Sequence, residues 1–470
     1  MAIDFTLTAE QKALQATARE SAQEVLKPLV AKADEEPEVA RATPALGAHR
    51  RPGCRAIRRA VMQGGRATRR AIVFASIVAI GVCPSRGSAQ TFPTFAFDGQ
   101  LRLRGEWDGR AVGTGDDAAT LSRIRLGARA TLSDWLLVYV QVQDARAWGT
   151  ESNTLTDASA DYFDMHQGFA ELGTDALRGR LGRQEVALGD QRLIGSVGWT
   201  NTGRAFDGAR LLGETNGVGW TVFWMNVAER DLLLPVGLQP QGNQGVSDDG
   251  WLIGGFASGK IGSATAELTA VVDKDAVTDE SYTLNLRAHG RTGSITYEAA
   301  GAYQFGPDRS AFFASGKVGV AVGRGTVTAQ VDYLSGDDDL TDSDVKAFNT
   351  LYATNHKFYG VMDYVLNPPG QLDQAGLVDA IVRGSVTLPS NKSVRVDLHR
   401  FWVAEERVGE RALGTELDVI GNWSFHSYAG LQLGGGVFLP EPLATQLLPA
   451  FGLGDDPTYW GYAQLTLFWP

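Results

Sequence analysis

The feature that most constrains this chain is a period-two alternation of polar and apolar residues that recurs from about residue 90 to the end. It is clear in residues 101–107, 123–130, 265–272, 327–333 and 394–399. Such alternation gives a β-strand one polar and one apolar face, and segments of about ten residues can cross a membrane as barrel strands. No segment after residue 90 approaches the roughly 18 uninterrupted apolar residues of a helical span. The body of the chain is therefore predicted to be all-β.

The connections between these segments alternate in length. On turn and strand signals we expect about 18 strands, which begin near residues 92, 120, 136, 165, 177, 206, 219, 250, 264, 282, 294, 310, 325, 376, 393, 413, 429 and 458. The long gaps are 149–164, 190–205, 231–249, 337–375 and 441–457, and the gaps between them are tight turns. A soluble sandwich has no reason to alternate its connections, whereas an outer-membrane barrel has short periplasmic turns and long extracellular loops. The pattern predicts a transmembrane antiparallel β-barrel.

A barrel of this strand number leaves a water-filled lumen, so a channel is the expected function. An outer-membrane hydrolase would need a nucleophile beside a histidine. No nucleophile motif accompanies the scattered histidines, which are His166, His289, His356, His399 and His426. Both cysteines, Cys54 and Cys83, precede the body. We therefore expect no enzyme activity, no cofactor and no metal site.

The first 89 residues differ in composition from the rest. Residues 1–38 resemble the N-terminus of an acyl-CoA dehydrogenase, and residues 39–89 contain ten arginines and no acidic residue. Residues 71–83 form an apolar run of 13 residues, too short for a membrane helix and typical of a secretory signal. We expect a non-native or disordered leader in 1–61, a signal peptide in 62–89 that starts at Met62, and the barrel in 90–470.

Several stretches of the body resemble the alginate export family of outer-membrane porins. The most specific is GRQEVALGDQRLIGSVGWTNTGRAFDGARL at 182–211, and YVQVQDARAWG at 139–149, FNTLYATNHKFYGVMDYV at 348–365 and LGTELDV at 413–419 also fit. The resemblance implies a bacterial outer-membrane barrel whose arginine-lined pore passes an anionic polysaccharide or a small anionic solute. It also implies a monomer that contacts outer-membrane lipid, lipopolysaccharide and the barrel assembly machinery, with no nucleic-acid partner.

Candidate pore residues come from strand parity and from the charged segment after residue 182. Parity directs Arg102, Arg104, Arg123, Arg125 and Arg129 inward as one basic stripe. A loop that carries both signs of charge is expected to fold into the lumen, where arginine forks can bind carboxylates. The loop and its flanks supply Arg183, Asp190, Arg192, Arg204, Asp207 and Arg210. The alternative is that these charges only satisfy one another.

The net charge bears on selectivity. Of 43 basic and 54 acidic residues, the first 89 positions hold 14 and 8, which leaves 29 and 46 and a net charge of −17. This charge repels a polyanion at long range. The acidic clusters 337–339, 248–249 and 455–456 fall in the expected outer loops. There they either remain hydrated or bind divalent cations. A general uptake porin for small solutes and a structural or adhesive barrel remain alternatives.

Overall fold

The computed structural model describes residues 93–110, 117–148, 161–228, 250–274 and 280–469. The expected leader, the signal peptide and the acidic pair 248–249 lie outside the described residues.

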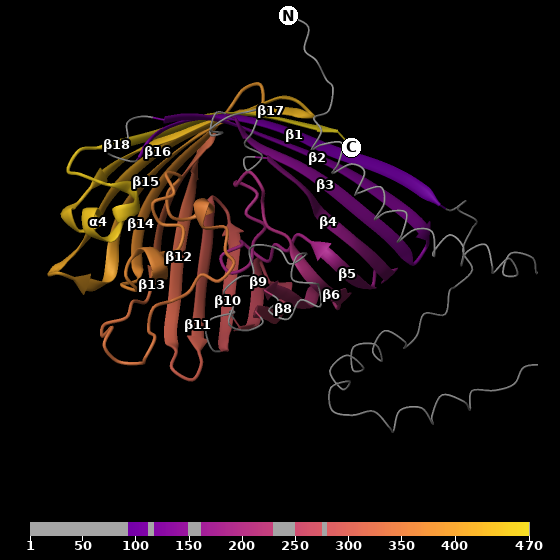
Figure 1. The fold of residues 1–470 in the computed structure, drawn as a ribbon, viewed down its shortest axis with the longest axis horizontal. Coiled ribbons are helices and arrows are strands. Elements are labelled where there is room, and N and C mark those ends of the chain that lie inside the picture. Colours follow the sequence, from indigo (N-terminus) through magenta and orange to yellow (C-terminus); the bar gives the residue numbers. More distant parts are fainter. Residues whose placement is uncertain (1–92, 111–116, 149–160, 229–249, 275–279, 470) are drawn as a thin grey trace, which may run out of the picture. The chain divides into compact units, whose positions relative to one another are not determined.

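Eighteen antiparallel strands form a closed barrel (Figure 1). They are β1 (Thr94–Gly109), β2 (Asp117–Ser133), β3 (Leu136–Trp148), β4 (Asp161–Thr174), β5 (Leu177–Gln184), β6 (Phe206–Thr215), β7 (Val218–Ala228), β8 (Gly250–Ile261), β9 (Ala264–Lys274), β10 (Ser281–Thr292), β11 (Ile295–Phe305), β12 (Ser310–Val322), β13 (Gly325–Leu334), β14 (Leu377–Leu388), β15 (Lys392–Arg407), β16 (Glu410–His426), β17 (Ala429–Pro440) and β18 (Thr458–Trp469). Each strand pairs with its sequence neighbours, and β1 also pairs with β18, which closes the sheet. The predicted fold and strand number are confirmed.

The two ends of the barrel differ in their connections. Every connection from an even-numbered strand to the next is two or three residues long, as at 134–135, 216–217 and 389–391. Of the connections at the other end, 185–205, 335–376 and 441–457 are long, whereas 306–309 and 408–409 are tight. The expected alternation of short turns and long loops is therefore confirmed, with two tight connections at the long-loop end.

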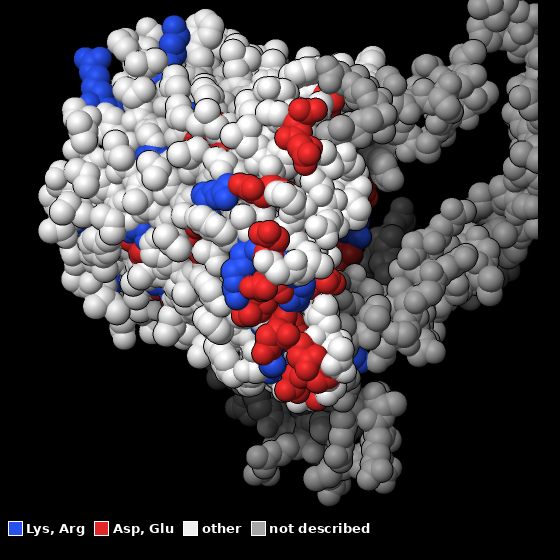
Figure 2. Space-filling view, turned by 90° about the vertical axis from the view of Figure 1, so that its left-hand side faces the viewer, with Lys and Arg blue, Asp and Glu red and all other residues white. Residues whose placement is uncertain are grey.

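The two faces of the barrel wall are chemically inverted relative to a soluble protein. On β2, Ile124 and Leu126 are 40% and 48% exposed on the outer face, whereas Arg123 and Arg125 are 4% and 8% exposed on the inner face. Figure 2 shows an outer wall that is largely uncharged between charged ends. An apolar outer band and a polar interior are what a barrel in a bilayer requires.

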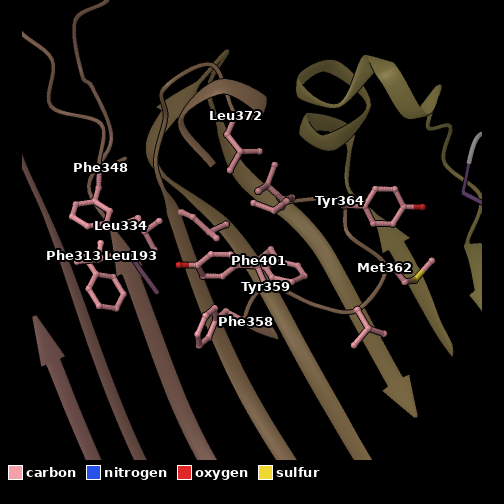
Figure 3. Close-up of a cluster of buried hydrophobic side chains, with 14 of the residues drawn as sticks. Leu193, Phe313, Leu334, Phe348, Phe358, Tyr359, Met362, Tyr364, Leu372 and Phe401 are labelled. Carbon is pink, nitrogen blue, oxygen red and sulfur yellow. The ribbon is translucent and has the colours of Figure 1, made fainter. Parts of the chain in front are cut away.

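The 335–376 loop folds into the barrel and supplies nine of the buried residues of its apolar interior. Its side chains pack against the inner faces of β12–β17 (Figure 3). The buried loop residues of this cluster are Phe348, Phe358, Tyr359, Val361, Met362, Tyr364, Val365, Leu372 and Ala375. Short helices mark the loops, namely η6 (Asn355–Lys357) and α3 (Pro368–Gln371) here, and α4 (Pro442–Leu447) and η7 (Pro449–Phe451) before β18. Sequence reasoning placed 337–375 in the external loops, and the structure corrects this because the segment has enough apolar side chains to form a core.

None of the helices in the described part of the chain is both long and apolar enough to cross a membrane.

Candidate functional site inside the barrel

The 185–205 loop crosses the lumen and is held by arginines of β1 and β2. Arg102 donates to the carbonyl oxygens of residues 198, 199 and 200 at 2.9, 3.1 and 2.8 Å. Arg104 donates to the Trp199 carbonyl at 2.8 Å and lies over the Trp199 ring at 4.0 Å. Arg123 donates to the carbonyls of 198 and 200 at 3.2 and 3.1 Å. These three guanidinium groups therefore satisfy backbone carbonyls that the loop would otherwise leave unpaired inside the barrel.

Arg125 fixes the two ends of the same loop. Its guanidinium donates to Glu185 at 2.9 Å and to the Thr202 carbonyl at 3.1 Å. Burial alone would raise the pKa of Glu185, but the hydrogen bond to His166 and the charge of Arg125 lower it. Gly203 has φ +74°, and a Cβ there would come within 2.6 Å of Arg125, so the turn requires glycine.

Two loops from distant parts of the sequence are joined in the lumen. Ile194 and Tyr352 form a parallel β-bridge, and the Arg204 guanidinium donates to the carbonyls of Tyr352 and Ala353. Burial lowers the pKa of Arg204. The Trp199 ring stacks on His356 with centroids 4.1 Å apart. The 185–205 loop is therefore fixed to the barrel wall at one side and to the 335–376 loop at the other.

The other residues expected from sequence are dispersed. Arg183 pairs with Asp207 at 2.7 Å and approaches Asp164 at 3.6 Å, beside a cavity of about 270 Å³. Arg129 is exposed and lies over the Tyr139 ring at 5.5 Å. Arg210 is paired in register with Arg180 on β5. The structure therefore joins Arg102, Arg104, Arg123 and Arg125 around one loop, and does not bring Arg129, Arg183 and Arg210 into that cluster.

A second group of basic residues lies on the wall from β10 to β15, around a cavity of about 180 Å³. Its cations are Arg192, Arg287, Lys317, Lys357, Arg383 and Arg395, and Asp190 and Glu298 also line it. We call these six cations the second basic cluster. Arg192 and Lys357 come from the two inner loops and the others from the strands, so the cavity forms only when both loops are in place.

Two carboxylates of this region are buried in the wall, while the cations paired with them stay accessible. Lys317 and Arg395 side chains are 32% and 37% exposed, but their partners Glu298 and Asp397 are 6% and 1% exposed. Arg287 also pairs with Glu298, at 2.6 Å, and Arg383 with Asp397, at 2.7 Å. An anion that enters the cavity would therefore meet accessible positive groups, with the negative groups behind them.

The pKa values of the two loop cations of the cluster are shifted in opposite directions. Burial would lower the pKa of Arg192, but the Asp332 carboxylate 2.8 Å away outweighs it and raises the pKa. Burial lowers the pKa of Lys357, since the neighbouring Asp190 only partly offsets the desolvation. Arg192 therefore stays charged and acts in the structure through its ion pair with Asp332.

Sequence reasoning missed most of the second basic cluster. Arg192 was selected, but Arg287, Lys317, Lys357 and Arg383 were not, and Arg395 was noted only for its place in an alternating strand. The alternation of polar and apolar residues along each strand would have shown that the strand residues of this cluster point inward. What the sequence could not show is which basic residues a folded loop would cover.

Comparison with known proteins agrees with this architecture. The sequence matches the family model for alginate export over residues 94–226 and 265–440. The structure is similar to the outer-membrane protein opdK of Pseudomonas aeruginosa, with 12% identity and a TM-score of 0.56 over 80% of this chain and 98% of that one. It is also similar to OccAB1 of Acinetobacter baumannii, with 12% identity and a TM-score of 0.55 over 80% and 96% of the two chains. OccK2 (OpdF) of Pseudomonas aeruginosa, solved in complex with glucuronate, shows 12% identity and a TM-score of 0.53 over 80% and 95%.

No curated protein matches the sequence. The structural likenesses, at 12% identity, show the fold. The family match covers well over half of the chain. The chain therefore belongs to the alginate export family and is a channel of the bacterial outer membrane.

Proposed function

We propose that this channel passes solutes that carry a sugar carboxylate, and that the second basic cluster is the part of the lumen that attracts them. The observation that carries the proposal is the asymmetry of that cavity, where Lys317 and Arg395 are accessible and Glu298 and Asp397 are buried behind them. Arginine and lysine bind carboxylates in this way without requiring a single fixed ligand. The channel has no catalytic step to perform.

Two comparisons support the sugar carboxylate as the substrate class. The family is named for the export of alginate, which is an anionic polymer of uronic acids. The structure of OccK2 (OpdF) holds glucuronate, the anion of a single uronic acid. Both ligands present a carboxylate on a polyhydroxylated ring, so both fit the same chemistry.

The net charge of the mature chain does not oppose this proposal. Its charge of −17 includes exposed acidic residues such as Asp338 and Asp339. Charges more than about 8 Å from a passing ion are largely screened at physiological salt. The cations around the cavity act at contact distance and in a medium of lower effective dielectric, where each has a larger effect.

The test is ion selectivity in planar bilayers, with Lys317→Gln and Arg395→Gln combined. Glu298 keeps its partner Arg287 and Asp397 keeps Arg383, so neither carboxylate is left unpaired. We expect anion preference in the wild type, and a reversal potential shifted toward cation preference in the double variant. The matched control is Lys260→Gln with Arg324→Gln, two exposed cations at the short-turn end. A cation-selective wild type that the double variant leaves unchanged would contradict the proposal.

Polymer export and small-solute uptake are separated by substrate length. Glucuronate and alginate oligomers of increasing length would be added on either side while current block is recorded. Block by glucuronate with short residence that lengthens with oligomer size supports passage of the polymer. Block by glucuronate alone, with longer oligomers excluded, assigns the channel to small anionic solutes.

A further inference from the structure

Four acidic side chains and a histidine are gathered on the inner face of β14–β16, behind the cations that line the cavity of about 180 Å³. Asp397 on β15 lies directly across from Asp418 on β16, and His399 lies across from Glu416. Asp379 reaches His399 from β14. All five are 0–1% exposed. Like charges directly opposite each other in a sheet are destabilising, so this arrangement requires a compensating positive charge.

Two of the carboxylates already have partners. Asp397 is paired with Arg383 at 2.7 Å and with Arg395 at 3.0 Å. Asp379 accepts from His399 Nδ1 at 2.9 Å. Glu416 and Asp418 face each other, with no arginine or lysine paired to either among the described ion pairs. A buried pair of carboxylates without a cation is costly.

Each of these two carboxylates is only half satisfied. Glu416 accepts from the Met362 amide at 2.9 Å, and Asp418 accepts from the Val361 amide at 3.3 Å. In the described part of the chain no hydrogen-bond partner reaches Glu416 Oε2 or Asp418 Oδ1, although both atoms are buried. Buried polar atoms are nearly always paired, so these two oxygens call for a proton or a metal ion in the site.

The histidine is oriented as a metal ligand. Its Nδ1 is occupied by the Asp379 carboxylate, which leaves Nε2 to face Asp418 at 3.9 Å. A carboxylate that holds one ring nitrogen, and so fixes the tautomer of the other, is the usual support of a metal-binding histidine. Ligand atoms of Asp397, His399 and Asp418 all lie within 4.8 Å of one another. Ligands around a four- to six-coordinate ion are separated by about 3–4 Å, so small side-chain rotations suffice.

We propose that His399 Nε2, Asp418 and Asp397 bind one divalent metal ion, with Glu416 beside Asp418 as a further candidate ligand. The mixed imidazole and carboxylate set suits Zn²⁺ or Mn²⁺ better than an all-oxygen ion such as Ca²⁺. The ion is structural, since Val361 and Met362 of the 335–376 loop cover the site and hydrogen-bond to its ligands. It joins that loop to the wall of β15 and β16.

The test is metal binding by the purified full-length protein in detergent. After chelation and dialysis, ZnCl₂ or MnCl₂ is titrated and bound metal is measured by mass spectrometry, together with the unfolding temperature. We expect one ion per chain and a rise in unfolding temperature, because an ion that binds only the folded state stabilises it. Asp418→Asn should abolish binding, and Asp379→Asn should weaken it by about tenfold or more through loss of histidine orientation.

The matched control is Glu441→Gln, a partly exposed carboxylate that pairs with Arg400 outside the cluster. It should bind metal as the wild type does. Absence of bound Zn²⁺ and Mn²⁺ from the folded wild type would overturn the proposal, as would undiminished binding by Asp418→Asn. A protonated-carboxyl band in the infrared spectrum that persists at saturating metal, and is lost in Asp418→Asn, would assign the site to a shared proton instead.

Discussion

Two walls of the same lumen carry arginines at equivalent inward positions, yet these arginines have different partners. On β1 and β2, Arg102 and Arg123 are each 4% exposed and donate to carbonyl oxygens of the 185–205 loop. On β14 and β15, Arg383 and Arg395 are 26% and 37% exposed beside a cavity, and each pairs with a carboxylate in the wall. The residue type and the strand parity are the same. The difference lies in the loop that each wall receives.

The difference teaches that an inward arginine is a pore residue only where the interior loops leave it uncovered. A loop whose backbone is unpaired recruits arginines as hydrogen-bond donors, because buried carbonyls must be satisfied. A loop that packs through apolar side chains leaves the cations of its wall paired with wall carboxylates and accessible from the lumen. The β1 and β2 arginines therefore position the 185–205 loop, while contact of solutes with the second basic cluster remains a proposal.

The largest expected effect comes from the apolar contacts of the 335–376 loop. Leu372 is fully buried, and Leu372→Ala is expected to destabilise the packed loop by about 2–5 kcal/mol. The loop carries Lys357, so its loosening should also weaken anion preference. Hydrogen exchange of residues 348–372 and reversal potentials measure both effects. Leu366→Ala is the control, since Leu366 is 42% exposed in the same loop, and an equal effect of both changes would contradict the packing argument.

A smaller effect is expected from the β1 and β2 arginines. Arg102→Ala with Arg123→Ala removes donors to the carbonyls of 198–200, and each hydrogen bond from a charged group contributes about 1.5–3 kcal/mol. We expect the 185–205 loop to detach, which should raise conductance and open-channel noise while anion preference persists.

Arg129→Ala is the matched control for that change, because Arg129 contacts the Tyr139 ring and not the loop. If the double variant instead abolished anion preference at unchanged conductance, the β1 and β2 arginines would be the selectivity residues. Solute selection would then belong to the wall of β1 and β2, and not to the second basic cluster.

The smallest effect concerns acid pH. The pKa of Glu185 is lowered by His166 and Arg125 against the effect of burial, so its stabilising contribution is complete above the ordinary glutamate pKa of about 4.3. The contribution is lost only as pH falls through the lower pKa of the folded state. Channel noise from the 185–205 loop should therefore stay constant from neutral pH to about pH 5 and rise only in stronger acid. Glu185→Gln should remove this rise in noise at acid pH. A wild-type channel whose noise already rises near neutral pH would contradict the role given to Glu185.

Much of the architecture was predictable from local pattern. Strand starts expected at 136, 177, 206, 250, 264, 310, 325, 429 and 458 coincide with those observed. Alternation is a local property, because side chains point to opposite faces at every second residue, and tight turns such as 216–217 have local signals. The inward direction of Arg102, Arg104, Arg123 and Arg125 followed from the same rule.

The sequence by itself therefore determined the barrel, the alternation of its connections and the faces on which its charges lie. The tertiary structure alone decided where the long loops go. Residues 348–365 contain apolar side chains that could have served an outer loop, and their burial against β12–β17 depends on contacts between segments distant in sequence. The pairing of Arg102 with carbonyls of 198–200 and the gathering of Asp397, His399, Glu416 and Asp418 arise in the same way. They depend on barrel closure and loop packing, which no local pattern encodes.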